Sequence, residues 1–180
     1  SLVSGFCKVN QIDRAVQLVE EKLSEGLCMN AGGFTSFIHE LCKKSELGSA
    51  LRFTKEMILR NMKPNDTLLT RLIKGLCKNK NHSDAVELWF LLLKKSFKVN
   101  TVASNALIHG LCEAGRMQDA GRLLKEMLER NVPLDRITYN TLIYGWCREG
   151  ELDGGFKLRE EMVKRGIVPD IVTYNLLMHG

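Results

Sequence analysis

The sequence predicts an all-α protein, an α-solenoid built from two-helix repeats of 35 residues. Five of its six cysteines recur at intervals of 35 residues: Cys7, Cys42, Cys77, Cys112 and Cys147. The same shift aligns two columns of small residues: Gly5, Gly75, Gly110, Gly145 and Gly180, and Ala15, Ala50, Ala85 and Ala120. The chain is 44% hydrophobic, 7% aromatic and contains 3 prolines, a composition typical of ordered helical proteins. Several columns that keep one period indicate an array of stacked units.

The period divides the chain into a single array without a linker or a low-complexity segment. The complete units are 31–65, 66–100, 101–135 and 136–170; residues 1–30 form most of an earlier unit, and residues 171–180 open a further one. Because the chain starts and stops inside the pattern, we expect it to be part of a longer protein.

Each unit is predicted to contain two amphipathic helices. In the unit 136–170 the apolar residues at helical spacing are Tyr139, Leu142, Ile143 and Trp146, then Leu152, Phe156, Leu158 and Met162. The segment "REGEL" separates the two helices. Gly166 is the expected C-cap, Pro169 follows it, and Asp170 stands where the next helix needs an N-cap. Because one helix pair cannot bury its apolar face alone, stacked neighbours must share a continuous core.

Composition and motifs argue against several classes of function. The net charge of +5 permits an anionic partner without requiring one. No run of about 18 apolar residues occurs, so we expect no membrane span. The segment "HELCK" resembles a zinc-protease motif, but Lys43 stands where that motif needs its second histidine. A phosphate-binding glycine loop, a Ser/His/Asp arrangement and the zinc-deaminase motif are also missing. We therefore predict no catalysis, no cofactor and no small-molecule substrate.

The cysteine column is interpreted as helix packing. Equivalent helices of neighbouring units lie about 8–10 Å apart, whereas a disulfide needs Cα atoms within about 7 Å. His39 with Cys42, and His109 with Cys112, lie one helical turn apart, but the two pairs are two units apart and no C-x-x-C motif occurs. We predict reduced, buried packing residues and no metal site.

A basic residue follows four of the five cysteines in the column. These residues are Lys8, Lys43, Lys78 and Arg148, with Glu113 as the exception. Each is expected at the end of the first helix of its unit. Two compatible interpretations remain open: the cation complements a helix C-terminus, or the column follows a phosphate backbone.

Polar residues hold the fifth and the last position of every unit. The fifth residues are Thr35, Thr70, Asn105, Asn140 and Asn175, and the last residues are Asn30, Asn65, Asn100, Asp135 and Asp170. Asn and Asp are strong N-caps, which accounts for the last column. The fifth residue lies inside a helix, where Asn and Thr are mediocre helix formers. Their recurrence predicts a surface that contacts a polar partner.

Two segments resemble the pentatricopeptide repeat (PPR) family: "ITYNTLIYGWCREGELDGGFKLREEMVKRGIVPD" and "IVTYNLLMHG". The family's pure 35-residue type reads V-T-Y-N-x-L-I-x-G-L-C-K-x-G, then a helix ending in E-M, then G-I-x-P-D. The "GLC" and "GFC" segments are similar to the plant restorer-of-fertility-like branch. The resemblance covers the whole chain and is weakest in residues 1–34, where Gly32 and Gly33 replace apolar and Thr positions. The tetratricopeptide family, the nearest alternative, has a 34-residue unit and a W-x₂-L-G-x₂-Y pattern that is missing here.

The resemblance implies a right-handed superhelix that binds single-stranded RNA, one base per repeat. It implies contacts with base edges for the fifth and last residues and contacts with phosphates for the four basic residues. It implies packing against base faces for the second residues, Thr67, Val102, Ile137 and Val172, whereas Gly32 offers no side chain. By the family's pairing habits, Thr35 with Asn65 and Thr70 with Asn100 resemble pairs that recognise adenine. Asn105 with Asp135 and Asn140 with Asp170 resemble pairs that recognise uracil.

The resemblance also implies a target and a role. PPR arrays lie parallel to RNA, so the expected core is 5′-AAUU-3′, followed by a pyrimidine that faces Asn175. The implied role is organellar RNA processing, stability or translation in a plant, with mitochondria favoured over chloroplasts. Two alternatives remain. One is a structural or protein-interaction solenoid within an organellar ribonucleoprotein such as a mitochondrial ribosome. The other is an enzyme whose catalytic domain lies outside these residues.

Overall fold

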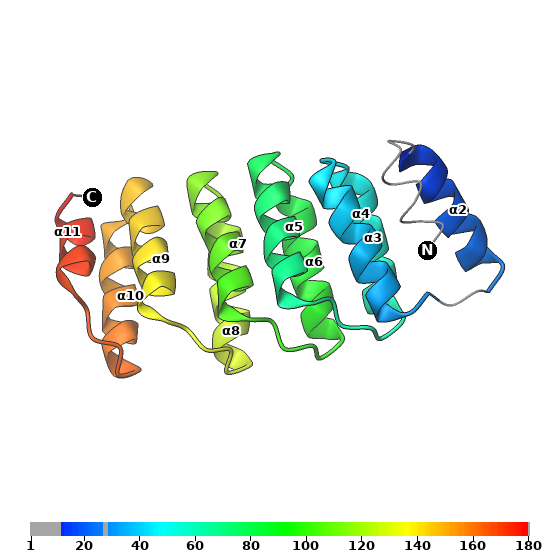
Figure 1. The fold of residues 1–180 in the computed structure, drawn as a ribbon. Coiled ribbons are helices and arrows are strands. Elements are labelled where there is room, and N and C mark those ends of the chain that lie inside the picture. The colour runs from blue at the N-terminus through cyan, green and yellow to red at the C-terminus, as the bar shows by residue number, and fades with distance from the viewer. Residues whose placement is uncertain (1–11, 27–28, 180) are drawn as a thin grey trace.

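The protein is a row of stacked helix pairs (Figure 1). This computed structural model describes residues 12–26 and 29–179. The helices of these residues are α2 (Ile12–Ser24), α3 (Ala31–Lys43), α4 (Leu47–Leu59), α5 (Asp66–Lys78), α6 (His82–Lys94), α7 (Thr101–Glu113), α8 (Met117–Glu129), α9 (Arg136–Arg148), α10 (Leu152–Lys164) and α11 (Ile171–His179). The described part of the chain contains no strand, and none of its helices is long and apolar enough to span a bilayer. The all-α solenoid and the eight helices expected between residues 31 and 170 are confirmed, and the handedness of the superhelix stays a prediction.

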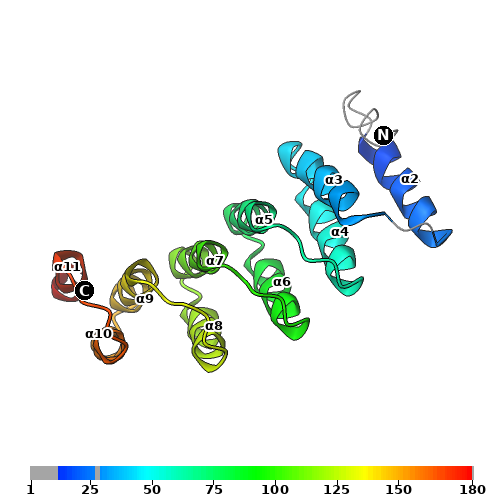
Figure 2. The same ribbon diagram turned by 60° about the horizontal axis from the view of Figure 1, so that its bottom comes forward.

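The helices form two layers (Figure 2). The first helices of the units, α3, α5, α7, α9 and α11, contact one another in chain order. The second helices, α4, α6, α8 and α10, each pack against the first helix of their own unit. Apolar residues from both layers, such as Leu72, Trp89 and Tyr139, are fully buried between them. This arrangement exposes one face of every first helix along the same side of the molecule.

The helices end at C-cap motifs like the one that the sequence predicts at Gly166. Gly166 has a φ of +74°, and its N–H donates to Val163 O at 2.9 Å, while Ile167 N–H donates to Met162 O at 3.0 Å. These two bonds form a Schellman motif, with Gly166 one residue beyond the C-cap Arg165. The other helix ends have a left-handed residue at the equivalent position: Gly26, Ser45, Asn61, Lys80, Ser96, Gly115, Asn131 and Gly150. Turns of one geometry therefore repeat along the array.

The cysteine and glycine columns meet where neighbouring first helices touch. A Cβ atom at Gly110 would lie 2.5 Å from Cys77 Sγ, and one at Gly145 would lie 2.7 Å from Cys112 Sγ. A residue without a side chain is needed there because the two helices approach so closely. Burial raises the pKa of the free thiols of Cys77 and Cys112 to about 11 and about 12, so both are protonated at neutral pH. Cys112 and Cys147 are buried as predicted, whereas Cys42 and Cys77 are half-buried. Gly5, Cys7 and Gly180 lie outside the described residues.

Candidate nucleic-acid interface

The last residue of each unit caps the first helix of the next unit. The Oδ1 atoms of Asn30, Asn65 and Asn100 accept backbone N–H groups three residues on, at 2.8, 2.7 and 2.7 Å. Asp135 and Asp170 accept the N–H groups of Thr138 and Thr173 in the same way, at 2.8 and 3.1 Å. The capping interpretation is therefore confirmed for all five residues. A cap commits one oxygen to the backbone and leaves the other polar atoms available to a partner.

Two of the fifth residues are held by these caps. Asn105 Nδ2 donates to both carboxylate oxygens of Asp135, at 3.2 and 3.3 Å. Asn140 Nδ2 donates to Asp170 Oδ1 at 3.5 Å. Because a carboxylate can only accept, each amide must turn its nitrogen toward it. The direct contact between Asp170 and Asn140 brings together a pair that the sequence placed 30 residues apart.

Both carboxylates are ionised at neutral pH, and hydrogen bonding lowers the pKa of each below its ordinary value. Partial burial raises the pKa of Asp135, but hydrogen bonds from Thr138 and Asn105 outweigh burial, and the pKa lies below its ordinary value. The backbone N–H of Thr173 and the Arg136 guanidinium lower the pKa of Asp170 to about 2. The face of the first helices therefore presents two negatively charged acceptors, the carboxylates of Asp135 and Asp170, beside Asn105 and Asn140.

A cleft between α5 and α7 gathers four of the predicted contact residues. It has a volume of about 510 Å³ and is lined by Asp66, Thr67, Thr70, Arg71, Lys74, Asn100 and Val102. Thr67 and Val102 are the second residues of two adjacent units, and Thr70 and Asn100 are the fifth and last residues of one unit. Thr70 Oγ1 donates to Asp66 O at 2.8 Å, so its oxygen remains an acceptor for a ligand. The cleft combines apolar walls with hydrogen-bonding groups.

The second residues form an exposed apolar row along the first helices. Val102, Ile137 and Val172 are 60%, 65% and 49% exposed, and Thr67 is also exposed. Most other large apolar side chains of these helices are buried, so the row is not explained by the core. Regularly spaced apolar side chains beside polar groups favour a ligand that has flat apolar faces and polar edges.

The four residues of the basic column do not share one environment. Lys8 lies outside the described residues. Lys43 pairs with Glu40 on its own helix at 2.8 Å. Lys78 lines a second, larger cleft. Contact of Lys43 and Lys78 with phosphate stays a prediction.

Arg148 forms hydrogen bonds with backbone oxygens of the preceding unit. Its Nη2 donates to the backbone oxygens of Cys112 and Glu113, at 2.5 and 3.0 Å. Its guanidinium also lies 5.6 Å from the centroid of the Tyr144 ring. Arg148 therefore complements the C-terminus of α7, the first helix of the preceding unit, rather than that of its own helix α9. These carbonyl contacts use Nη2, and contact of Arg148 with phosphate stays a prediction.

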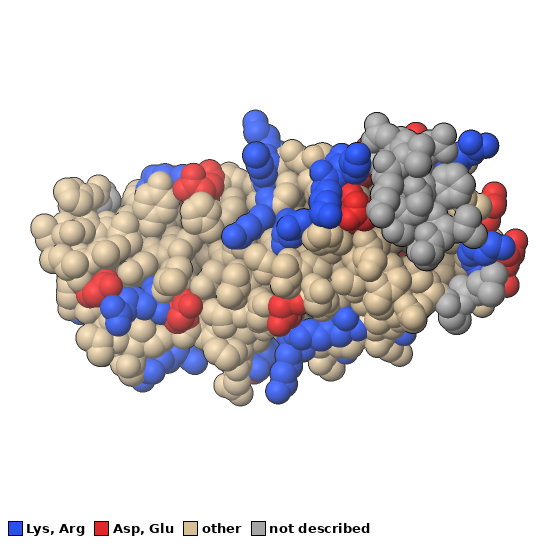
Figure 3. Space-filling model, in the orientation of Figure 1, with Lys and Arg blue, Asp and Glu red and all other residues tan. Residues whose placement is uncertain are grey.

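Sequence reasoning found only part of a cationic cleft, because it identified Lys78 and not Lys74 or Lys80. Lys74, Lys78 and Lys80 line a cleft of about 780 Å³ between α5 and α7, together with His109. Among the described residues none pairs with these three lysines, although Glu113 lines the same cleft. Figure 3 shows Lys and Arg side chains gathered over the upper ends of α3 and α5 on this face. The spacing of Lys74 and Lys78, four residues apart in one helix, could have revealed it.

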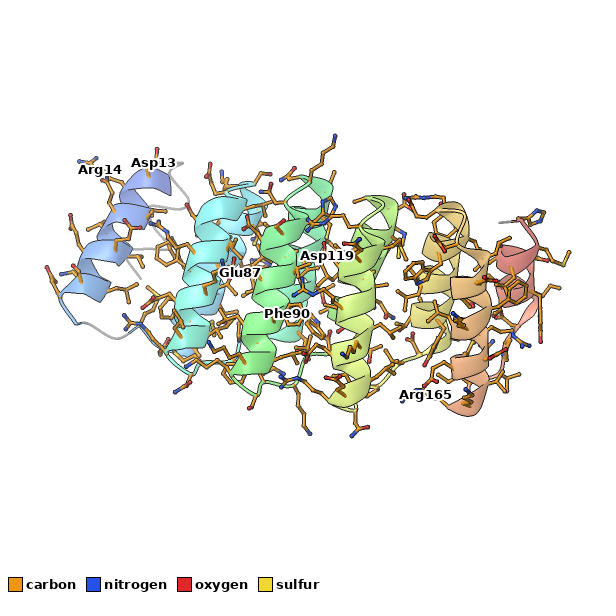
Figure 4. All side chains as sticks on the ribbon, turned by 180° about the vertical axis from the view of Figure 1, so that it is seen from behind. Asp13, Arg14, Glu87, Phe90, Asp119 and Arg165 are labelled. Carbon is orange, nitrogen blue, oxygen red and sulfur yellow. The ribbon has the colours of Figure 1, made fainter. Side chains whose placement is uncertain are left out.

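On the opposite face of the molecule, Figure 4 labels three charged residues that each have an ion-pair partner, Glu87, Asp119 and Arg165. Glu87 pairs with Lys55 of the preceding unit at 2.8 Å. Asp119 pairs with Arg116 at 2.6 Å, and Arg165 pairs with Glu161 at 2.7 Å. The Arg122 guanidinium lies 5.8 Å from the Phe90 ring centroid.

Among the described residues no group of three His, Cys, Asp or Glu side chains could hold a metal ion. The candidate site is therefore the face of the first helices.

Comparison with protein families identifies the repeat. The PPR repeat family matches residues 99–148 and 134–180. A second description, the PPR repeat, matches residues 1–27, 34–62 and 68–97. The matched segments together span nearly the whole chain. The sequence matches no curated protein.

Solved structures share the fold at low sequence identity. The maize pentatricopeptide repeat protein PPR10 is 22% identical with a TM-score of 0.58, and the match covers 98% of this chain and 25% of PPR10. PPR10 in complex with an 18-nt psaJ RNA element is 19% identical over 98% of this chain and 26% of that one, with a TM-score of 0.61. The PPR domain of Arabidopsis thaliana protein-only RNase P 1, in complex with tRNA, is 14% identical with a TM-score of 0.64, and the match covers 98% of this chain and 93% of that domain. The chain thus spans about a quarter of the length of PPR10.

Proposed function

The chain belongs to the PPR repeat family, and on this premise we propose that it binds single-stranded RNA sequence-specifically, one base per repeat. The binding surface is the exposed face of the first helices. The chain itself supplies recognition and no catalytic step. The RNA complexes of PPR10 and of the Arabidopsis PPR domain support an RNA partner.

The cleft that contains Thr67, Thr70, Asn100 and Val102 carries the proposal. A base inserted between Thr67 and Val102 would bury both of its faces against β-branched side chains. Its edge would then meet Thr70 and Asn100. Stacking between bases and aromatic side chains contributes about 1–3 kcal/mol per base, and contacts with these smaller side chains should lie at or below the low end. Because every base has a flat face, the edge contacts must supply the selectivity.

The polar groups suit the proposed core 5′-AAUU-3′. Thr70 offers an acceptor and Asn100 Nδ2 a donor, which complement the N6 amino group and N1 of adenine. Thr35 with Asn65 supplies the same residue types in the preceding unit. Asn105 and Asn140 offer one donor and one acceptor each, which complement O4 and N3–H of uracil. Asn175, the next fifth residue, would face a pyrimidine at the following position.

The RNA backbone would pass the lysine cleft. Lys74, Lys78 and Lys80 bring three positive charges to one cleft, and cations that neutralise phosphates supply most of the sequence-independent affinity. Lys43 would extend this path toward the N-terminal end. We further propose an organellar role, in mitochondria or alternatively chloroplasts, in RNA processing, stability or translation. This part rests on the sequence resemblance alone.

Selection of RNAs from a random pool by the 180-residue chain tests the proposal. We expect enrichment of a short motif with two adenines followed by two uracils. The double variant Asn105→Ala/Asn140→Ala should lose the preference for the two uracils and keep that for the adenines. Glu87→Ala, on the opposite face, serves as the matched control and should enrich the same motif as the wild type. A pool without enrichment would overturn the proposal and favour a structural or protein-interaction solenoid.

A further inference from the structure

We propose that Thr138 and Thr173, the third residues of their units, are positioning residues that fix the amide of the preceding unit's fifth residue and thereby set its base selectivity. The inference rests on the proposed function. Neither threonine belongs to the second, fifth and last positions to which base contacts were assigned. Each acts on the RNA only through Asn105 or Asn140.

The hydrogen bonds are equivalent in the two units. Thr138 Oγ1 donates to Asn105 Oδ1, at 2.5 Å, and Thr173 Oγ1 donates to Asn140 Oδ1, at 2.7 Å. Each hydroxyl also lies near its own cap, 2.8 Å from Asp135 Oδ1 and 3.1 Å from Asp170 Oδ1. A hydroxyl has one hydrogen, and in both units the amide oxygen is the nearer acceptor. The threonine hydroxyl therefore donates its hydrogen to the amide oxygen rather than to the carboxylate.

Each amide is consequently held at both ends. The carboxylate of the cap binds Nδ2, and the threonine hydroxyl binds Oδ1. One contact alone would leave the amide free to pivot, because the terminal torsion of Asn has a broad energy profile. Two contacts fix its plane and leave one N–H and one lone pair for a base. The threonine thus determines where these two groups point.

The two units differ in how much they depend on threonine. Asp135 holds Asn105 with both oxygens, at 3.2 and 3.3 Å. Asp170 holds Asn140 with one oxygen at 3.5 Å, and its other oxygen pairs with Arg136 at 3.0 Å. The carboxylate contact is weaker at Asn140. Loss of the hydroxyl should therefore matter more for Asn140 than for Asn105.

Burial shows that the threonines do not contact RNA themselves. Thr138 and Thr173 are both 0% exposed, whereas Asn105 and Asn140 are partly exposed. In this sequence, threonine stands at the third position of a unit only where the fifth residue of the preceding unit is asparagine. Where the fifth residue is Asn105 or Asn140, the third residue of the next unit is Thr; where it is Thr35 or Thr70, that residue is Leu68 or Ala103. Each hydroxyl also serves its own helix, because it accepts the backbone N–H of the cap, from Asp135 at 3.5 Å and from Asp170 at 3.2 Å, and so completes a capping box. The same oxygen can accept this bond and still donate its hydrogen to the amide of the preceding unit.

The test replaces each threonine with the isosteric valine. RNA oligonucleotides with the core 5′-AAUU-3′ are compared with cores altered at the third base, 5′-AACU-3′ and 5′-AAGU-3′, and at the fourth, 5′-AAUC-3′ and 5′-AAUG-3′. The wild-type chain should prefer uracil by about tenfold at each position. Thr173→Val should reduce the preference at the fourth base to about twofold and leave the third unchanged. Thr138→Val should reduce only the preference at the third base, by a smaller factor. Thr138→Ser and Thr173→Ser retain the hydroxyl and should behave like the wild type.

A second readout does not depend on RNA. In the free ¹⁵N-labelled protein, the side-chain amide hydrogens of Asn140 should exchange several-fold faster in Thr173→Val than in the wild type or Thr173→Ser. Unchanged exchange in both valine variants, or full uracil preference in both, would overturn the positioning role. A wild-type chain without base preference would overturn the proposed function, and the exchange rates would still decide whether threonine holds the amide.

Discussion

At the scale of single residues, the surface proposed to bind RNA contains side chains that already have partners within the protein. Asn140 donates one hydrogen to Asp170 and accepts one from Thr173, so only part of the amide is available to a ligand. Asp170 in turn caps α11 and pairs with Arg136. A substitution at the fifth position therefore changes the ligand contact and the support around it together.

Asn140→Thr should change the base that this unit recognises. The substitution removes the amide and leaves one hydroxyl on a shorter side chain, which makes room for a larger purine. In PPR proteins a Thr and Asp pair resembles one that recognises guanine, so uracil should be disfavoured at the fourth base and guanine favoured. Each mismatch should cost about 1–3 kcal/mol, measured by competition between 5′-AAUU-3′ and 5′-AAUG-3′ for both proteins. Equal weakening of both RNAs would mean that Asn140 serves the helix rather than the base.

At the scale of the helix, regular stacking depends on small residues at the contacts between first helices. Gly110 sits against Cys77, and Gly145 sits against Cys112 and Met117. The glycine weakens its own helix, since Gly costs about 1 kcal/mol relative to Ala in a helix interior. Its presence in this column is explained by the close approach of the neighbouring helix.

Gly110→Ala should destabilise the protein by about 1–2 kcal/mol, because overpacking at Cys77 outweighs the gain in helix propensity. Gly48→Ala is the matched control. A Cβ atom at Gly48 meets no atom within 4 Å. Because Gly48 is the second residue of α4 rather than an interior one, this variant should keep its stability or gain up to about 0.5 kcal/mol. Denaturant unfolding followed by circular dichroism measures both. A Gly110→Ala variant as stable as Gly48→Ala would show that the interface yields to the added methyl group.

At the scale of the whole molecule, positive charge is distributed unevenly along the array. The three lysines of the cleft between α5 and α7 have no pairing partner among the described residues. Toward the other end, Arg148 binds backbone carbonyl groups and pairs with Glu113 at 3.5 Å. An RNA should therefore be attracted most strongly over the units 66–100 and 101–135.

The salt dependence of RNA binding should distinguish the lysines of the cleft from Arg148. In Lys74→Ala, Lys78→Ala and Lys80→Ala variants, the slope of log K against log salt should flatten by about 0.7 for each lost phosphate contact, equally for all RNA sequences. Arg148→Ala should leave the slope unchanged and lower the midpoint of thermal unfolding, since it removes the contacts with the end of α7. A slope that flattens as much in Arg148→Ala as in Lys78→Ala would contradict this division.

The repeat, the helix pairs and the caps could be predicted from the amino-acid sequence, whereas the positions assigned to base contacts stay a prediction. Those features are local: Asp170 caps the helix that follows it, and Gly166 ends the helix before it, so a 35-residue period exposes them directly. Contacts between side chains of different units became apparent only from the stacked arrangement of the helices. Arg148 bonds to α7, Thr173 bonds to Asn140, and Lys78 shares a cleft with His109 and Glu113 of the next unit. Such contacts depend on how neighbouring units stack, and aligned columns cannot show them because a column records equivalent positions rather than adjacent ones.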